Sequence, residues 1–108
     1  MDFKTIAKDF FEAGIGTDSF RELYNNCFNL MKEDRDNALI YHLIGSMARS
    51  YVLTYDDQPV KPESAIKSKA LLEHYNSKVV LALESESDVR LRVLGEIAIE
   101  YQFDIHNF

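Results

Sequence analysis

Cysteine is nearly absent from this chain of 108 residues, which contains only Cys27. A single thiol forms no disulfide framework and no cluster of thiolate metal ligands. Cys27 follows Tyr24 in a helix-like apolar pattern, and a free cysteine in such a setting is usually a small buried side chain. We therefore expect a structural thiol and not a nucleophile.

Glycine-rich motifs and long apolar runs are also missing. The four glycines form no G-x-x-x-x-G-K-[ST], G-x-G-x-x-G or G-x-S-x-G pattern, which removes the common nucleotide-binding and nucleophile-elbow classes. No run of roughly eighteen apolar residues predicts a membrane span. The start, Met1-Asp2-Phe3, shows no signal-peptide pattern, so a cytoplasmic location is expected.

Positive charge is scarce, with 12 Lys and Arg against 18 Asp and Glu and a net charge of -6. This balance disfavours a basic surface for nucleic acid or anionic lipid and favours a basic partner. Hydrophobic residues make up 46% of the chain, including six Tyr and seven Phe. That is enough to build a core without metal or disulfide, so residues 1–108 are expected to form a single helical domain.

Apolar residues recur at helical spacing along most of the chain, which predicts an all-α fold. The first helix should begin after Asp2 as its cap and stop at a left-handed Gly14. A capping box of Ser19 and Glu22 should start the second helix, which is expected to end near Lys32 or Glu33.

Residues 37–54 are apolar on more than one side, which is typical of a central helix. Gly45 interrupts this helix at a cost of about 1 kcal/mol against alanine, so close approach of another helix is expected there. After a proline-containing loop at 55–62, Pro62 should open a fourth helix, and Asn76-Ser77 is a candidate break in it. Residues 79–83 fit a strand or a helix, and helix is favoured because a lone strand has no partner. With a last helix over 89–101, the prediction is a compact bundle of five to six helices.

Histidines provide no metal-site pattern. His42, His74 and His106 form neither an H-E-x-x-H motif nor a compact His/Cys cluster. We therefore predict no metal and no cofactor. The aromatic residues of the tail, Phe103 and Phe108, suggest that it docks on the bundle.

Arg35 and His42 are the only pair that suggests enzymatic chemistry. Their spacing at the start of a helix resembles the R-x(4–6)-H signature of HEPN-type ribonucleases. The resemblance implies acid–base chemistry for His42 and phosphate support by Arg35, two helical turns apart on one face. The net acidity argues against RNA binding, so we keep the ribonuclease as an alternative and name no catalytic residues in the main prediction.

Acidic residues gather in two connecting segments. Glu84, Glu86 and Asp88 precede the last helix, and Asp56 and Asp57 follow Tyr55 in the proline loop. These six residues are the predicted partner-binding site, since a negative surface with an aromatic anchor fits a basic cleft. The competing interpretation is a set of scattered solubilising charges.

In size, acidity and helical character the chain resembles bacterial immunity proteins, including those of contact-dependent growth inhibition systems. The resemblance implies a binding protein without catalytic activity that neutralises a cognate basic toxin domain, often a nuclease, by occluding its active site. A homodimeric helical adaptor or regulatory protein is the other alternative, and an exposed apolar face would favour it.

Overall fold

The computed structural model describes residues 1–104, which fold into five α-helices and one short 3₁₀ turn. In chain order they are α1 (Phe3–Glu12), α2 (Thr17–Glu33), η1 (Arg35–Asn37), α3 (Ala38–Tyr55), α4 (Pro62–Leu83) and α5 (Ser87–Asp104). This range contains no strand. The predicted all-α bundle of five to six helices is confirmed.

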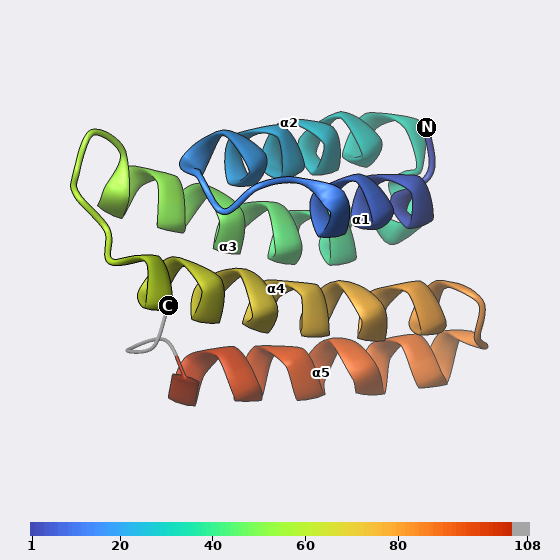
Figure 1. The fold of residues 1–108 in the computed structure, drawn as a ribbon. Helices are drawn as coiled ribbons and strands as arrows, with labels where there is room; N and C mark the ends of the chain where they lie inside the picture. The colour runs from blue at the N-terminus through green and yellow to red at the C-terminus, as the bar shows by residue number, and fades with distance from the viewer. Residues whose placement is uncertain (105–108) are drawn as a thin grey trace.

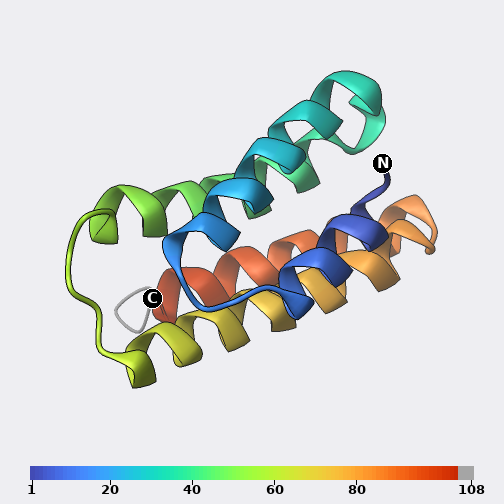
Figure 2. The ribbon, with the colours of Figure 1, turned by 45° about the horizontal axis from the view of Figure 1, so that its top comes forward.

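The helices are arranged as two antiparallel hairpins joined through α1. α2 packs along α3, α4 packs along α5, and α1 contacts both α2 and α4 (Figures 1 and 2). Because successive helices from α2 onward alternate in direction, α3 and α5 run the same way, and the α2–α3 and α4–α5 connections lie at the same end (Figure 1).

The core is built around aromatic side chains from the first three helices. Phe20 is completely buried, stacks on Tyr51 with 3.9 Å between ring centroids, and meets the Phe10 ring edge-on at 5.2 Å. Such ring pairs stabilise a core beyond the area they bury. They fix α1, α2 and α3 relative to one another.

The start of α1 follows the prediction, but its end does not. The Asp2 carboxylate accepts a hydrogen bond from the Thr5 amide at 2.9 Å, as a capping residue should. The predicted left-handed stop at Gly14 is wrong, because no glycine in residues 1–104 has a positive φ. The helix instead leaves through Ala13 in an extended conformation.

The predicted capping box at the start of α2 is also wrong. The helix already begins at Thr17, with Gly16 as its cap. The Ser19 hydroxyl donates to the Gly16 carbonyl at 2.9 Å instead of accepting a bond from a backbone amide. Ser19 therefore lies inside the first turn. The end of α2 at Glu33 agrees with the prediction.

α4 is one uninterrupted helix. It begins at Pro62 as predicted, but the suggested break at Asn76-Ser77 does not occur. The Ser77 hydroxyl donates to the Glu73 carbonyl within the helix at 3.0 Å, and Asn76 is buried. Residues 79–83 complete the helix, which confirms the helical alternative.

Gly45 allows the close packing that was expected of it. A Cβ atom at this position would lie 2.6 Å from Cε1 of Phe28 and 3.2 Å from Cβ of Cys27, both on α2. The prediction that α3 is central holds only in part. Its outer side faces solvent, where Leu39 is 64% and Leu53 is 72% exposed.

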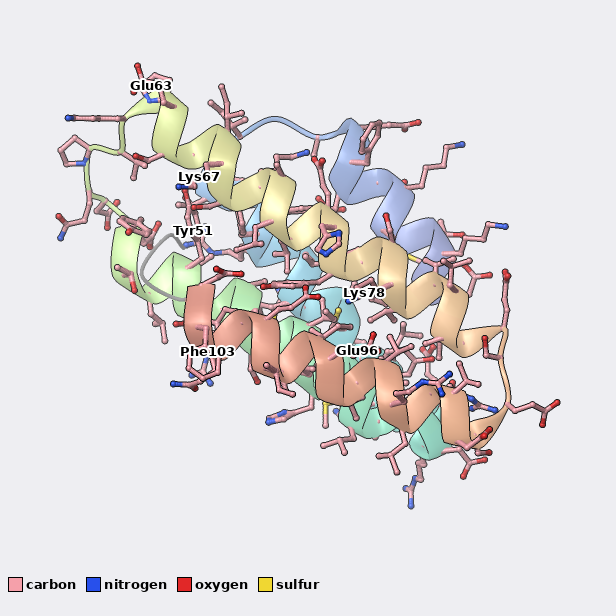
Figure 3. The ribbon with its side chains drawn as sticks, turned by 90° about the horizontal axis from the view of Figure 1, so that it is seen from below. Tyr51, Glu63, Lys67, Lys78, Glu96 and Phe103 are labelled. Atoms are coloured by element: carbon pink, nitrogen blue, oxygen red, sulfur yellow. The ribbon has the colours of Figure 1, made fainter. Side chains whose placement is uncertain are left out.

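α5 lies at the edge of the bundle and packs mainly on α4. Ile97 is its one fully buried residue. The two helices are also joined by Lys78, whose ammonium lies 2.7 Å from Glu100 and 3.6 Å from Glu96 (Figure 3). Among residues 1–104, no helix combines the length and the apolarity that crossing a membrane requires.

Candidate functional site

The structure divides the six predicted partner-binding residues between two ends of the molecule. Tyr55, Asp56 and Asp57 precede α4, whereas Glu84, Glu86 and Asp88 follow it. Because α4 contains 22 residues, the two groups are about 33 Å apart at 1.5 Å per residue. Figure 1 shows the two connections at opposite ends. The six residues therefore form two separate surfaces.

The first group forms a tight turn that is partly neutralised within the chain. The Gln58 amide donates to the Tyr55 carbonyl at 3.0 Å, and Asp57 has a positive φ of 61°. This is the pattern of a type II turn, where aspartate tolerates the left-handed position. Asp56 forms an ion pair with Arg21 at 3.0 Å, and that contact raises the pKa of Arg21.

The second group lies beside a hydrogen-bond network that holds the α2–α3 and α4–α5 connections together. Arg90 of α5 donates to the Ser85 carbonyl at 3.1 Å and to the Asn37 side-chain oxygen at 2.9 Å. The Asn37 amide in turn donates to Asp34 at 2.8 Å, and the Tyr41 hydroxyl donates to the same carboxylate at 2.6 Å. Residues far apart in the sequence are thus fixed at one end of the bundle.

This arrangement gathers more acids than the sequence analysis identified. The acidic end, as we call it, consists of the exposed carboxylates Glu33, Asp36, Glu84, Glu86 and Asp88. Within residues 1–104, none of these five forms an ion pair. The alternating directions of the helices were the signal that could have placed Glu33 and Asp36 at the same end of the bundle as the other three, and Asp36 shares a hollow with Ser87 and Arg90.

A hollow of about 200 Å³ lies beside the acidic end. It is lined by Asp36, Asn37, Leu39, Ile40, Ser87, Arg90, Leu91 and Leu94. Its leucine and isoleucine side chains offer an apolar surface next to the carboxylates. A partner could therefore place an apolar side chain here while its basic residues meet the acidic end.

The thiol and the candidate metal ligands do not form a reactive site. Cys27 is buried, as predicted, and burial raises the pKa of its thiol to about 12. Within residues 1–104, no three His, Cys, Asp or Glu side chains are grouped so that they could hold a metal ion. His106 lies outside the described residues, as do the tail positions 105–108.

The proposed ribonuclease pair is not on one regular α-helix. Arg35 belongs to η1, whereas His42 lies in α3. The His42 ring is exposed, lies 3.4 Å from the Ser46 hydroxyl oxygen, and faces the Phe28 ring at a centroid distance of 6.4 Å. His74 is also exposed and lies 3.3 Å from Glu100.

Acid should weaken the network at this end. Hydrogen bonds from Asn37 and Tyr41 lower the pKa of Asp34 below its ordinary 3.8. The unfolded state therefore binds the proton first, so this stabilisation is complete above that value and is lost as pH falls through the folded pKa. We expect Asp34→Asn to reduce the acid dependence of the free energy of unfolding by on the order of 1 kcal/mol.

Denaturant titrations of the native protein and Asp34→Asn across the acid range would measure this difference. The ion pair with Lys78 also lowers the pKa of Glu100, so Glu100→Gln provides a comparison at a site far from the network. Identical pH profiles for the native protein and Asp34→Asn would contradict the assigned role of Asp34.

Comparisons with known proteins place the chain in no family. No protein-family model matches it, and neither curated proteins nor solved structures include a match.

Proposed function

We propose that this is a binding protein of the immunity type, which neutralises a cognate basic toxin domain of the nuclease class by covering its active site. The observation that carries the proposal is the acidic end, where two connections are held together and five exposed carboxylates form no ion pair within residues 1–104. A negative surface on a rigid scaffold suits a partner whose functional cleft is lined by Lys and Arg.

The proposed mechanism is electrostatic steering followed by steric occlusion. The carboxylates attract the basic cleft over a distance of about one Debye length, roughly 8–10 Å at moderate salt. The neighbouring hollow then accepts an apolar side chain from the partner, which slows dissociation. Association should therefore weaken as salt is added, whereas an interface held by the apolar contact alone would respond little.

The test begins with capture of the partner from the native host and measurement of its affinity with purified components. In Glu84→Lys/Glu86→Lys/Asp88→Lys, we expect the association rate to fall by about 10–1000-fold, because attraction is replaced by repulsion. Stopped-flow or surface-plasmon measurements at two salt concentrations would report the rate and its salt dependence.

A matched control is Asp57→Lys/Glu63→Lys, which reverses charge at the opposite end of α4. Neither residue forms an ion pair within the described part of the chain. Lysine is nevertheless less favourable than the native acid at the left-handed Asp57 position and in the first turn of α4, so circular dichroism must verify that this control is folded. If this control lost binding while the triple variant kept it, the partner would bind at the opposite end of α4, and the proposed site at the acidic end would be wrong. RNA cleavage by the native protein, abolished in His42→Ala, would instead support the ribonuclease alternative.

A further inference from the structure

A groove of about 680 Å³ runs between α1 and α4, which lie side by side in Figure 2. This volume is within the range that is typical of ligand sites. Phe11 of α1 and Leu81 of α4 line the groove and are 67% and 68% exposed. Ala7 and Ala70 also line it, and their short side chains leave room between the two helices. No residue of the acidic end takes part, so this α1–α4 groove is a second candidate surface.

A buried amide without a hydrogen-bond partner belongs to the lining of the α1–α4 groove. Asn76 is only 2% exposed, and within residues 1–104 neither its Nδ2 nor its Oδ1 atom has a partner. Such a group is unfavourable unless a water molecule or a ligand satisfies it. Because a side-chain amide both donates and accepts, Asn76 favours an occupant that supplies an acceptor and a donor side by side.

The surroundings of Asn76 offer few partners to a water molecule bound there alone. A buried water typically makes about three hydrogen bonds. The neighbours of Asn76 four residues away on α4 are the apolar Leu72 and Val80. The carboxylate of Glu73 is already paired with Lys69 at 2.7 Å. A ligand that brings both a donor and an acceptor therefore satisfies the amide more completely than water does.

The length of the groove favours an extended peptide as this ligand. The α4 residues that line it run from Ala70 to Leu81, about 17 Å along the helix axis. Roughly five residues of extended chain have this length. A residue in an extended chain presents its N–H and C=O groups on the same edge, and these two groups match the Asn76 side chain. In such complexes main-chain hydrogen bonds supply affinity, and side-chain contacts supply specificity.

The unpaired charge in the groove is opposite in sign to that of the acidic end. The charged or titratable side chains in its lining are Lys8, Glu73 and His74. Glu73 is paired with Lys69, and His74 lies 3.3 Å from Glu100. Lys8 forms no ion pair within residues 1–104. An acidic side chain on the peptide would therefore complement the groove.

Binding requires a local rearrangement of side chains. The polar atoms of Asn76 are covered in the free protein, so lining side chains must shift before a peptide can reach them. Exposed side chains such as Phe11 and Leu81 change rotamer within nanoseconds, and rotamer changes are common when interfaces form. We propose that the α1–α4 groove binds a short extended peptide that carries an acidic side chain, and that Asn76 forms paired hydrogen bonds with the peptide backbone.

Purified protein and a phage-displayed library of random heptapeptides test this proposal without the toxin partner. The selected peptides should carry Asp or Glu beside apolar residues, and calorimetric titration would measure their affinity. Asn76→Leu should weaken binding by about tenfold or more, because it removes both hydrogen bonds. Asn25→Leu makes the same change at an exposed position of α2 and should leave the affinity unchanged. A library that yields no binder would overturn the proposal.

Backbone methylation of a selected peptide tests the paired hydrogen bonds directly. Each amide nitrogen of the peptide is methylated in turn. Methylation of the nitrogen that faces Asn76 removes the donor, so the affinity for the native protein should fall by about tenfold. The same methylation should have little further effect on binding to Asn76→Leu, where the contact is already absent. Equal losses with the two proteins at every position would overturn the proposal.

Unfolding without peptide distinguishes a ligand contact from an amide that holds a structural water. An unsatisfied amide contributes no stability, so Asn76→Leu should unfold at the same urea concentration as the native protein or at a higher one. A lower midpoint together with unchanged peptide affinity would assign Asn76 to a buried water and overturn the proposal. Peptides that lose binding in Glu84→Lys/Glu86→Lys/Asp88→Lys but not in Asn76→Leu would also overturn it, because they would bind at the acidic end. Far-ultraviolet circular dichroism verifies that each variant is helical.

Discussion

Replacing Phe20 with alanine is expected to lower the free energy of unfolding by about 3–5 kcal/mol. The Phe20 ring is fully buried and contacts both Tyr51 and Phe10. Its removal leaves a cavity where three helices meet, and the stacked Tyr51 ring loses its partner. Because small domains are stable by about 5–15 kcal/mol, this one change should remove a large part of the total.

Phe11→Ala is the matched control for Phe20→Ala. Phe11 belongs to the same aromatic-rich stretch, but 67% of it is exposed on α1. Its truncation should change the free energy of unfolding by less than about 1 kcal/mol. Urea titrations of both variants would measure the difference. Equal losses would show that the Phe20 stack does not hold the bundle together.

Alanine at the two helix-interior glycines on α3 and α5 should shift stability in opposite directions. Gly45→Ala forces a Cβ atom against Phe28 and Cys27, and such overpacking costs about 1–3 kcal/mol. Gly95→Ala enters open space and should stabilise the monomer by about 1 kcal/mol through helix propensity. Thermal and denaturant unfolding in dilute solution would measure both.

The substitution is the same at the two positions, so each variant controls for the other. If Gly45→Ala proved as stable as Gly95→Ala, the Phe28 ring would have to move aside without cost, and close packing of α2 on α3 would not depend on glycine. If Gly95→Ala destabilised the isolated chain, the open space beside α5 would be filled by something within the chain.

Apolar periodicity predicted most of the helices because burial of one stripe decides where a helix packs. The apolar stripe beginning at Phe3 correctly predicted the first helix, and Gly45 correctly predicted the close approach of another helix. Local polar chemistry was less informative. Ser19 donates to a carbonyl instead of capping, and Asn76 is buried inside a helix that it was expected to interrupt. In both cases packing of the surrounding helix outweighs the preference of the single residue.

The candidate site was only partly predictable for a different reason. Glu84, Glu86 and Asp88 are neighbours in the sequence, so they lie close together whatever fold the chain adopts. Asp36 joins them only because the helices alternate in direction and Arg90 bonds to Asn37. The same alternation separates them from Asp56 and Asp57. The identity of the partner remains a proposal, since it depends on surfaces outside this chain.

Only one residue of α5 is fully buried, and this affects which part of the protein unfolds first. Ile97 is the only fully buried residue of α5, and Val93, Leu94 and Tyr101 pack against the core while partly exposed. Detachment of α5 should therefore cost less than global unfolding. Amide hydrogens of α5 would then exchange through a sub-global opening that leaves α1 to α4 protected. The last helix would behave as a separate cooperative unit, which any molecule covering its outer side would slow.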